Sequence, residues 1–230
     1  MLTAGCTTSP GSSSPTSTAG SPSSTAGSDD GASPAERDAD DVEVAWLDDG
    51  RAIGLVTWGS STCLPHVEDV QADGQSIAVT MGDSDQQACT DDLVPRAVLA
   101  MLPEGVDVTK DIDVRLTHGD RTADADLDGL DAAPQGAGDQ QPSAGWFDDD
   151  GIVLLTWGSS SCPPVVQDVA MADAGATVTF NDFETADRVC TMDFAPRATA
   201  ITLPEEHDDD APFTLTLVGD NLDGEVVVRG

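Results

Sequence analysis

The phrase "TWGSSTC" at residues 57–63 is written again as "TWGSSSC" at residues 156–162. The two fourteen-residue stretches that begin with these phrases agree at ten positions. A second block agrees at nine of sixteen positions, between residues 89–104 and residues 190–205. Self-similarity over this length indicates that one module has been duplicated. The sequence therefore predicts a first module over residues 41–129 and a second over residues 145–230, with a Pro/Gly/Gln-rich linker at 130–144.

The segments that lead into the repeated phrase indicate β-structure. "AIGLVTW" (52–58) and "GIVLLTW" (151–157) are apolar at nearly every position, which is typical of a strand covered on both faces. Asp49-Gly50 and Asp150-Gly151 precede or open these strands and favour hairpin turns. No stretch shows an apolar period of 3.6 residues. The expected fold is all-β, with each module a small sandwich or barrel.

The cysteines follow the repeat. Cys63 and Cys89 lie in the first module, and Cys162 and Cys190 lie at the matching places in the second. Four cysteines allow three pairings, and duplication favours one disulfide within each module. Such bonds persist in an oxidising compartment. No Cys-x-x-Cys is present and the three histidines do not repeat, so zinc is disfavoured.

The fifth cysteine lies in "LTAGC", residues 2–6. This segment resembles the lipobox of bacterial lipoproteins of the actinobacterial type. The resemblance implies that Cys6 carries a diacylglycerol and that the protein is anchored to the outer, extracytoplasmic face of the cell membrane. The basic and apolar segments of a signal peptide are missing from the sequence, so we expect them in frame upstream of Met1.

The segment at residues 7–40 separates this lipobox remnant (1–6) from the first module. It is rich in Ser, Thr, Pro and Gly and contains no large apolar residue before the module begins. Such a composition cannot bury enough apolar surface to offset its ordering entropy. We therefore expect a disordered tether that holds the modules away from the membrane.

The chain is strongly acidic. Lys and Arg number 9 against 43 Asp and Glu, which gives a formal net charge of −34. Nucleic acid and anionic lipid head groups repel such a surface. The expected partners are the membrane, through the lipid, and an envelope protein, a peptide or a glycan of unknown identity.

The serines of the repeated phrase invite a catalytic interpretation. A serine nucleophile needs a base within hydrogen-bond reach. His66 lies near the phrase in the first copy, but the second copy has Val165 at that position. A structural turn pinned by the cysteine explains both copies. We therefore expect a non-catalytic protein without a cofactor.

Two pairs of residues are candidates for binding. Trp46 and Trp146 begin the first hairpin of each module, and we expect them to be partly exposed. Trp58 and Trp157, by contrast, share strand faces with apolar residues and are expected to pack over the disulfides.

Arg96 and Arg197 recur in "PRA" and form the second candidate pair. An ion pair with Asp92 and Asp193 respectively, or an anion site, would explain their repetition.

Asp124, Asp126 and Asp128 match the start of a calcium-binding loop, with Gly129 at the sixth position. The twelfth position should be a glutamate and is Gln135 instead. These three aspartates form a weak calcium candidate.

The leading functional hypothesis is a lipid-anchored extracytoplasmic envelope protein that acts by binding or as a structural component. One alternative is a surface-presented module that binds peptides or inhibits proteases through loops 81–88 or 181–189. A second alternative is a secreted hydrolase that uses pairs of acidic residues.

Overall fold

The computed structural model describes residues 40–230 except residues 87, 135–137, 183–188 and 210. These residues form fourteen β-strands and one short 3-10 turn, η2 (Asp48–Gly50), with no α-helix among them. The predicted all-β class is confirmed. In this part of the chain, no helix of the length and apolarity needed to cross a bilayer occurs.

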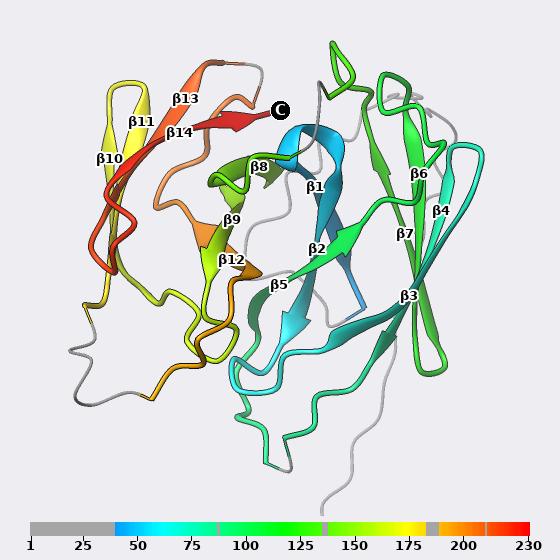
Figure 1. The fold of residues 1–230 in the computed structure, drawn as a ribbon, viewed down its shortest axis with the longest axis horizontal. Coiled ribbons are helices and arrows are strands. Elements are labelled where there is room, and N and C mark those ends of the chain that lie inside the picture. The colour runs from blue at the N-terminus through cyan, green and yellow to red at the C-terminus, as the bar shows by residue number, and fades with distance from the viewer. Residues whose placement is uncertain (1–39, 87, 135–137, 183–188, 210) are drawn as a thin grey trace, which may run out of the picture. The chain divides into compact units, whose positions relative to one another are not determined.

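The first repeat folds into two sheets (Figure 1). Three strands pair in the order β1-β2-β5, and four pair in the order β3-β4-β6-β7. Between them lies a core of buried residues that both sheets contribute, including Leu55, Val79 and Val114. The strands are β1 (Val42–Leu47), β2 (Ala52–Gly59), β3 (His66–Asp73), β4 (Ser76–Gly82), β5 (Val94–Met101), β6 (Ile112–His118) and β7 (Arg121–Leu127).

The second repeat has the same strand order, but its strands form one continuous sheet of seven. The connection is made by β14, which runs parallel to β8 and pairs Val228 with Ala144. Its core includes Leu154, Phe180 and Phe213. The strands are β8 (Ser143–Asp148), β9 (Gly151–Gly158), β10 (Val166–Ala172), β11 (Gly175–Phe180), β12 (Ala195–Thr202), β13 (Phe213–Val218) and β14 (Gly224–Arg229).

Strands β2 and β9 are buried on both faces. In β2, Ile53 and Leu55 face the core of the first repeat, whereas Val56 and Trp58 belong to a different cluster. Because alternate residues of a strand point to opposite faces, a strand without a polar face must be covered twice. The prediction of covered strands in "AIGLVTW" and "GIVLLTW" is confirmed.

The second cover of β2 is the other repeat. A third apolar cluster joins the repeats and takes corresponding positions from both, among them Leu47 with Phe147, Val56 with Leu155, and Trp58 with Trp157. The expectation of two separate sandwich or barrel modules is therefore wrong. The outer face of each three-stranded group is too apolar to remain in water, so the repeats are stacked into one layered β-structure.

Close approach of the repeats explains two glycines. A Cβ atom on Gly54 would lie 2.9 Å from Val153 Cγ1, across the cluster that joins the repeats. A Cβ atom on Gly145 of β8 would collide with the backbone oxygen of Trp46 in β1. Strands β1 and β8 can lie side by side in this way only where one of them lacks a side chain.

Candidate functional site

The repeated phrase forms the turn between β2 and β3, and between β9 and β10, where a disulfide fixes it. Cys63 bonds Cys89 and Cys162 bonds Cys190, with Cα–Cα distances of 5.4 Å and 5.5 Å. The predicted pairing is confirmed. We call residues 59–64 with 89–93 the first corner, and residues 158–165 with 189–194 the second corner.

Hydroxyl groups and one aspartate tie each corner together. In the first corner the carboxylate of Asp92 accepts the Ser61 backbone N–H at 3.1 Å and the Thr90 hydroxyl. The Thr90 N–H in turn donates to Ser60 Oγ at 3.0 Å. Hydrogen bonds from Ser61 and Thr90 lower the pKa of Asp92 to about 2.

The second corner repeats this network. Asp193 accepts the Ser160 N–H at 3.1 Å and the Thr191 hydroxyl, and hydrogen bonds from Ser160 and Thr191 lower its pKa to about 2. The hydroxyls of Ser60 and Ser159 are hydrogen-bonded to threonine hydroxyls and not to an imidazole. The Nε2 atom of His66 lies 3.9 Å from Oε1 of Glu68. The hydrogen bonds within each corner hold its turn.

The recurring arginines hydrogen-bond to the backbone of the corners. Arg96 donates through Nη1 to the Cys63 carbonyl at 2.9 Å, and Arg197 makes the same bond to the Cys162 carbonyl at 2.9 Å. Each guanidinium lies against the glycine of the phrase, so that a Cβ on Gly59 would lie 2.6 Å from Arg96 Cζ. Arg96 and Arg197 therefore bind backbone carbonyls. Burial lowers the pKa of Arg96, and the negative charge of Asp92 also acts on Arg96, against this lowering.

The expected partial exposure of Trp46 and Trp146 is wrong. Their exposed fractions are 3% and 6%, because each points from its strand into the core of its own repeat. Alternation in "VEVAWL" places Trp46 on the same face as two valines, and this signal could have predicted the burial. Trp46 donates its indole N–H to the Asp128 carbonyl at 2.7 Å.

Trp58 and Trp157 do not pack over the disulfides, where we expected them. Trp58 packs in the cluster that joins the repeats, edge-to-face with Phe147 at a centroid distance of 6.3 Å. Trp157 stacks on Phe194, with ring centroids 6.1 Å apart.

The calcium candidate is not a loop. Asp124 and Asp126 lie on strand β7, exposed on its outer face, and Asp128 follows the end of that strand. The Asp124 carboxylate pairs with Arg115 at 2.7 Å across the sheet. An extended strand spreads alternate aspartates apart, so these residues do not form the loop that the sequence pattern predicted. Within the described ranges, no three His, Cys, Asp or Glu side chains are arranged to hold a metal ion.

The structure nevertheless brings Trp46 and Trp146 to one place. Where β1 lies beside β8, a groove of about 190 Å³ opens between residues of both repeats. We call it the acidic groove, because six of its lining residues are acidic and none of those described is basic. The acidic residues are Glu43, Asp126, Asp128, Asp148, Asp149 and Asp209.

Apolar residues form the floor of the acidic groove. Val44, Leu127 and Phe147 line it together with the edges of the two tryptophans. Unlike Trp46, Trp146 has a buried indole N–H without a hydrogen-bond partner in the described structure. The pyrrole edge of Trp146 faces Gly230, another lining residue, since a Cβ there would lie 3.9 Å from Trp146 Cδ1.

The groove collects residues that sequence reasoning did not single out. Asp148 and Asp149 belong to a run of three aspartates, and Asp209 belongs to "EEHDDD" at 205–210. Such runs are usually solvated loops, and only the stacking of the repeats brings them together. Cys6 and most of the tether lie outside the described residues, as do residues within the two loops considered for protease inhibition.

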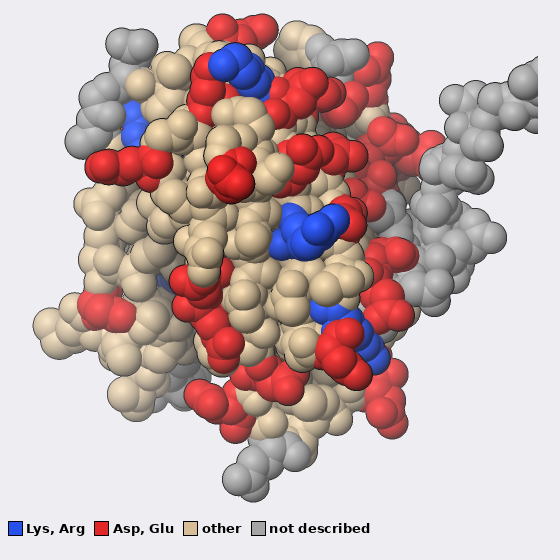
Figure 2. Space-filling model, turned by 90° about the vertical axis from the view of Figure 1, so that its right-hand side faces the viewer, with Lys and Arg blue, Asp and Glu red and all other residues tan. Residues whose placement is uncertain are grey.

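Acidic side chains also dominate the wider surface. Figure 2 shows the face over β3, β4, β6 and β7, where acidic groups are spread widely and basic groups form only small spots. Comparison with known proteins finds no matching family model, no matching curated protein and no matching solved structure.

Proposed function

We propose that this chain is a non-catalytic binding protein of the cell envelope, which takes up a cationic ligand in the acidic groove. The observation that supports this most directly is the composition of the groove. Six acidic residues from both repeats surround an apolar floor, and the described lining contains no basic residue. An apolar wall next to a carboxylate strengthens its attraction for a cation by excluding water.

The ligand that fits this arrangement is polyatomic. The carboxylates of the described residues line a groove without converging as a metal ion requires. Ammonium or guanidinium groups on an extended chain can reach several of them in turn. A lysine- or arginine-rich segment of an envelope protein or peptide is therefore the proposed ligand class, and the net charge of −34 attracts it over a distance.

The proposed location rests on two further observations. Both intra-repeat disulfides are present, and such bonds persist in an oxidising compartment. The lipobox-like segment ending at Cys6 supports attachment to the outer face of the membrane through a lipid. The tether between Cys6 and the first strand would present the groove to partners in the envelope.

Calorimetric titration with hexalysine tests the function. We expect binding that Asp149→Asn with Asp209→Asn weakens by about tenfold, because two charges of the groove are lost. The matched control is Asp69→Asn with Glu225→Gln, which removes the same charge from exposed sites on β3 and β14. The control should lose less than about threefold. Equal losses in both pairs would show attraction to net charge alone and would contradict a groove.

A further inference from the structure

The exposed apolar residues of this protein are concentrated at the corners. Nine large hydrophobic side chains are exposed among the described residues, and six of them flank a disulfide. An isolated exposed apolar residue needs no explanation, whereas a cluster indicates an interaction surface. The six are Leu64 and Leu93 at the first corner, and Val165, Val189, Met192 and Phe194 at the second.

The second corner carries the larger cluster. Val189 and Met192 flank Cys190 and are 97% and 103% exposed, and Phe194 is 61% exposed. The disulfide holds Cys190 within 5.5 Å of Cys162, measured between Cα atoms, so Val165 lies on the neighbouring segment. Phe194 is supported from behind by Trp157, on which it stacks. These contacts give the cluster a fixed base.

The two corners have the same frame and different surfaces. The disulfide, the arginine and the hydrogen-bond network recur in both. At the positions of Met192 and Phe194, however, the first corner has Asp91 and Leu93. The frame therefore forms with either set of side chains, and folding does not require the exposed methionine and phenylalanine.

Among the described residues that surround the apolar side chains of the second corner, two are aspartates. Asp193 lies between Met192 and Phe194 in the chain, and Asp168 is exposed three residues beyond Val165. The guanidinium of Arg197 is directed to the Cys162 carbonyl. A partner that covers the apolar side chains would meet these carboxylates at its edges, so complementary partners are apolar at the centre and basic at the rim.

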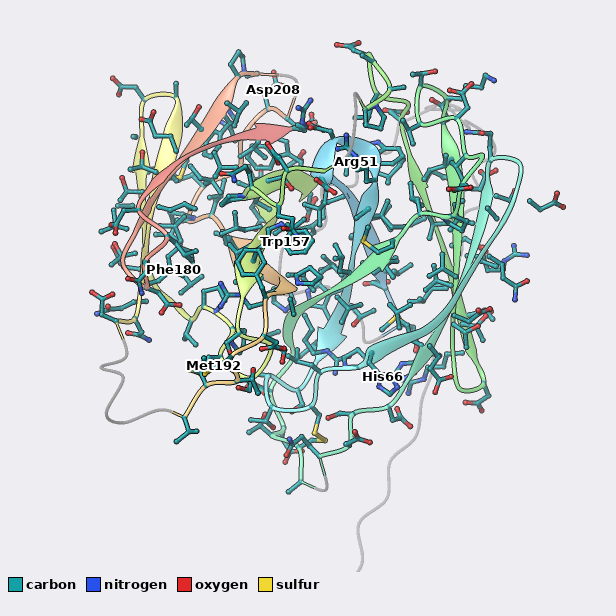
Figure 3. The ribbon with its side chains drawn as sticks, in the orientation of Figure 1. Arg51, His66, Trp157, Phe180, Met192 and Asp208 are labelled. Atoms are coloured by element: carbon teal, nitrogen blue, oxygen red, sulfur yellow. A yellow bond between two sulfur atoms is a disulfide. The ribbon has the colours of Figure 1, made fainter. Side chains whose placement is uncertain are left out.

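We propose that the second corner is a docking surface for a basic peptide segment of another protein, which inserts apolar side chains against Met192 and Phe194. It is independent of the acidic groove. Figure 3 shows Met192 in the lower half of the view, whereas Asp208, the neighbour of the groove residue Asp209, lies near the top. The first corner has Asp91 at the position where the second corner has Met192. This difference between the copies would make the second corner a binding surface.

Two synthetic peptides of equal charge test the proposal. One alternates lysine with leucine and the other alternates lysine with serine. We expect the leucine peptide to bind the wild-type protein about tenfold more tightly, because it buries apolar surface. Met192→Asp with Phe194→Leu gives the second corner the residues of the first and should abolish that difference. Asp149→Asn with Asp209→Asn, in the groove, should leave the difference unchanged.

The converse exchange provides a gain of function. Asp91→Met with Leu93→Phe should create a second corner site of the same preference and raise by one the number of leucine peptides bound to each molecule. Equal affinity for both peptides in the wild-type protein would overturn the proposal. So would self-association, or binding to neutral phosphatidylcholine vesicles, that is lost in the Met192→Asp, Phe194→Leu variant. These outcomes would assign the surface to a second copy or to lipid.

Discussion

At the scale of single residues, the repeated phrase is explained by what each side chain contacts. The tryptophan packs between the repeats or on Phe194, the glycine makes room for a guanidinium, and a serine supplies an N–H to an aspartate. The cysteine then fixes the turn to the segment that carries the aspartate and threonine. The tryptophan, the glycine, one serine and the cysteine thus have structural partners in both copies, and this accounts for the repetition of the phrase.

The aspartates of the corners make stability depend on pH. The pKa of Asp92 and of Asp193 is lowered to about 2 in the folded protein, by hydrogen bonds from serine and threonine. A lowered pKa contributes stability that is present above the unfolded value, near 4, and is lost as the pH falls towards about 2. We therefore expect Asp92→Asn with Asp193→Asn to lower the unfolding temperature at neutral pH, by an amount that shrinks to nothing across this window.

Thermal unfolding followed by circular dichroism from about pH 7 to about pH 2 measures this. The matched control is Asp69→Asn with Asp168→Asn, at corresponding positions on β3 and β10. A difference between the corner variant and wild type that persists at the lowest pH would show that the aspartates act through packing instead of charge.

At the scale of elements, the cluster between the repeats decides how the molecule unfolds. Phe147 is buried there against Trp58, and its truncation leaves a cavity. We expect Phe147→Ala to cost about 3 kcal/mol or more. Because the cluster couples the repeats, the wild-type protein should unfold in one transition and the variant in two.

Urea unfolding followed by tryptophan fluorescence tests this coupling. Val227→Ala, at an exposed site on β14, is the control and should change the free energy of unfolding by less than about 0.5 kcal/mol. Two transitions in the wild-type protein would mean that the repeats are independent.

The sequence predicts the individual strands and disulfides but not the contact between the repeats. Hairpins, covered strands and disulfides follow from local patterns, because Asp-Gly turns, unbroken apolar runs and cysteine spacing act within one module. The apolar run "AIGLVTW" does not reveal which element covers its second face. A further sheet of the same module would require the same apolar pattern as the other repeat does. The acidic groove depends on that cover. Its residues come from separate segments of both repeats, so no local pattern predicts it.

At the scale of the whole molecule, the proposed lipid attachment at Cys6 would determine where the groove acts. When the gene is expressed with the sequence upstream of Met1, we expect the protein to partition into detergent and to take up labelled fatty acid. Cys6→Ser should release it into the aqueous phase, since Cys6 is the proposed site of acylation. Cys6→Ser protein that stays in the detergent phase would contradict lipid attachment at Cys6.

The glycine at position 54 shows what joining two copies in one chain makes possible. Gly54 and Val153 occupy the same place in their repeats, and they meet across the cluster between them. In a symmetric pair of identical repeats the same residue would stand on both sides. Two glycines would leave a void and two valines would collide, whereas the single valine side chain fills the space that the glycine leaves. Two identical copies cannot break their symmetry in this way, so a single repeat could not rebuild this contact by pairing with itself.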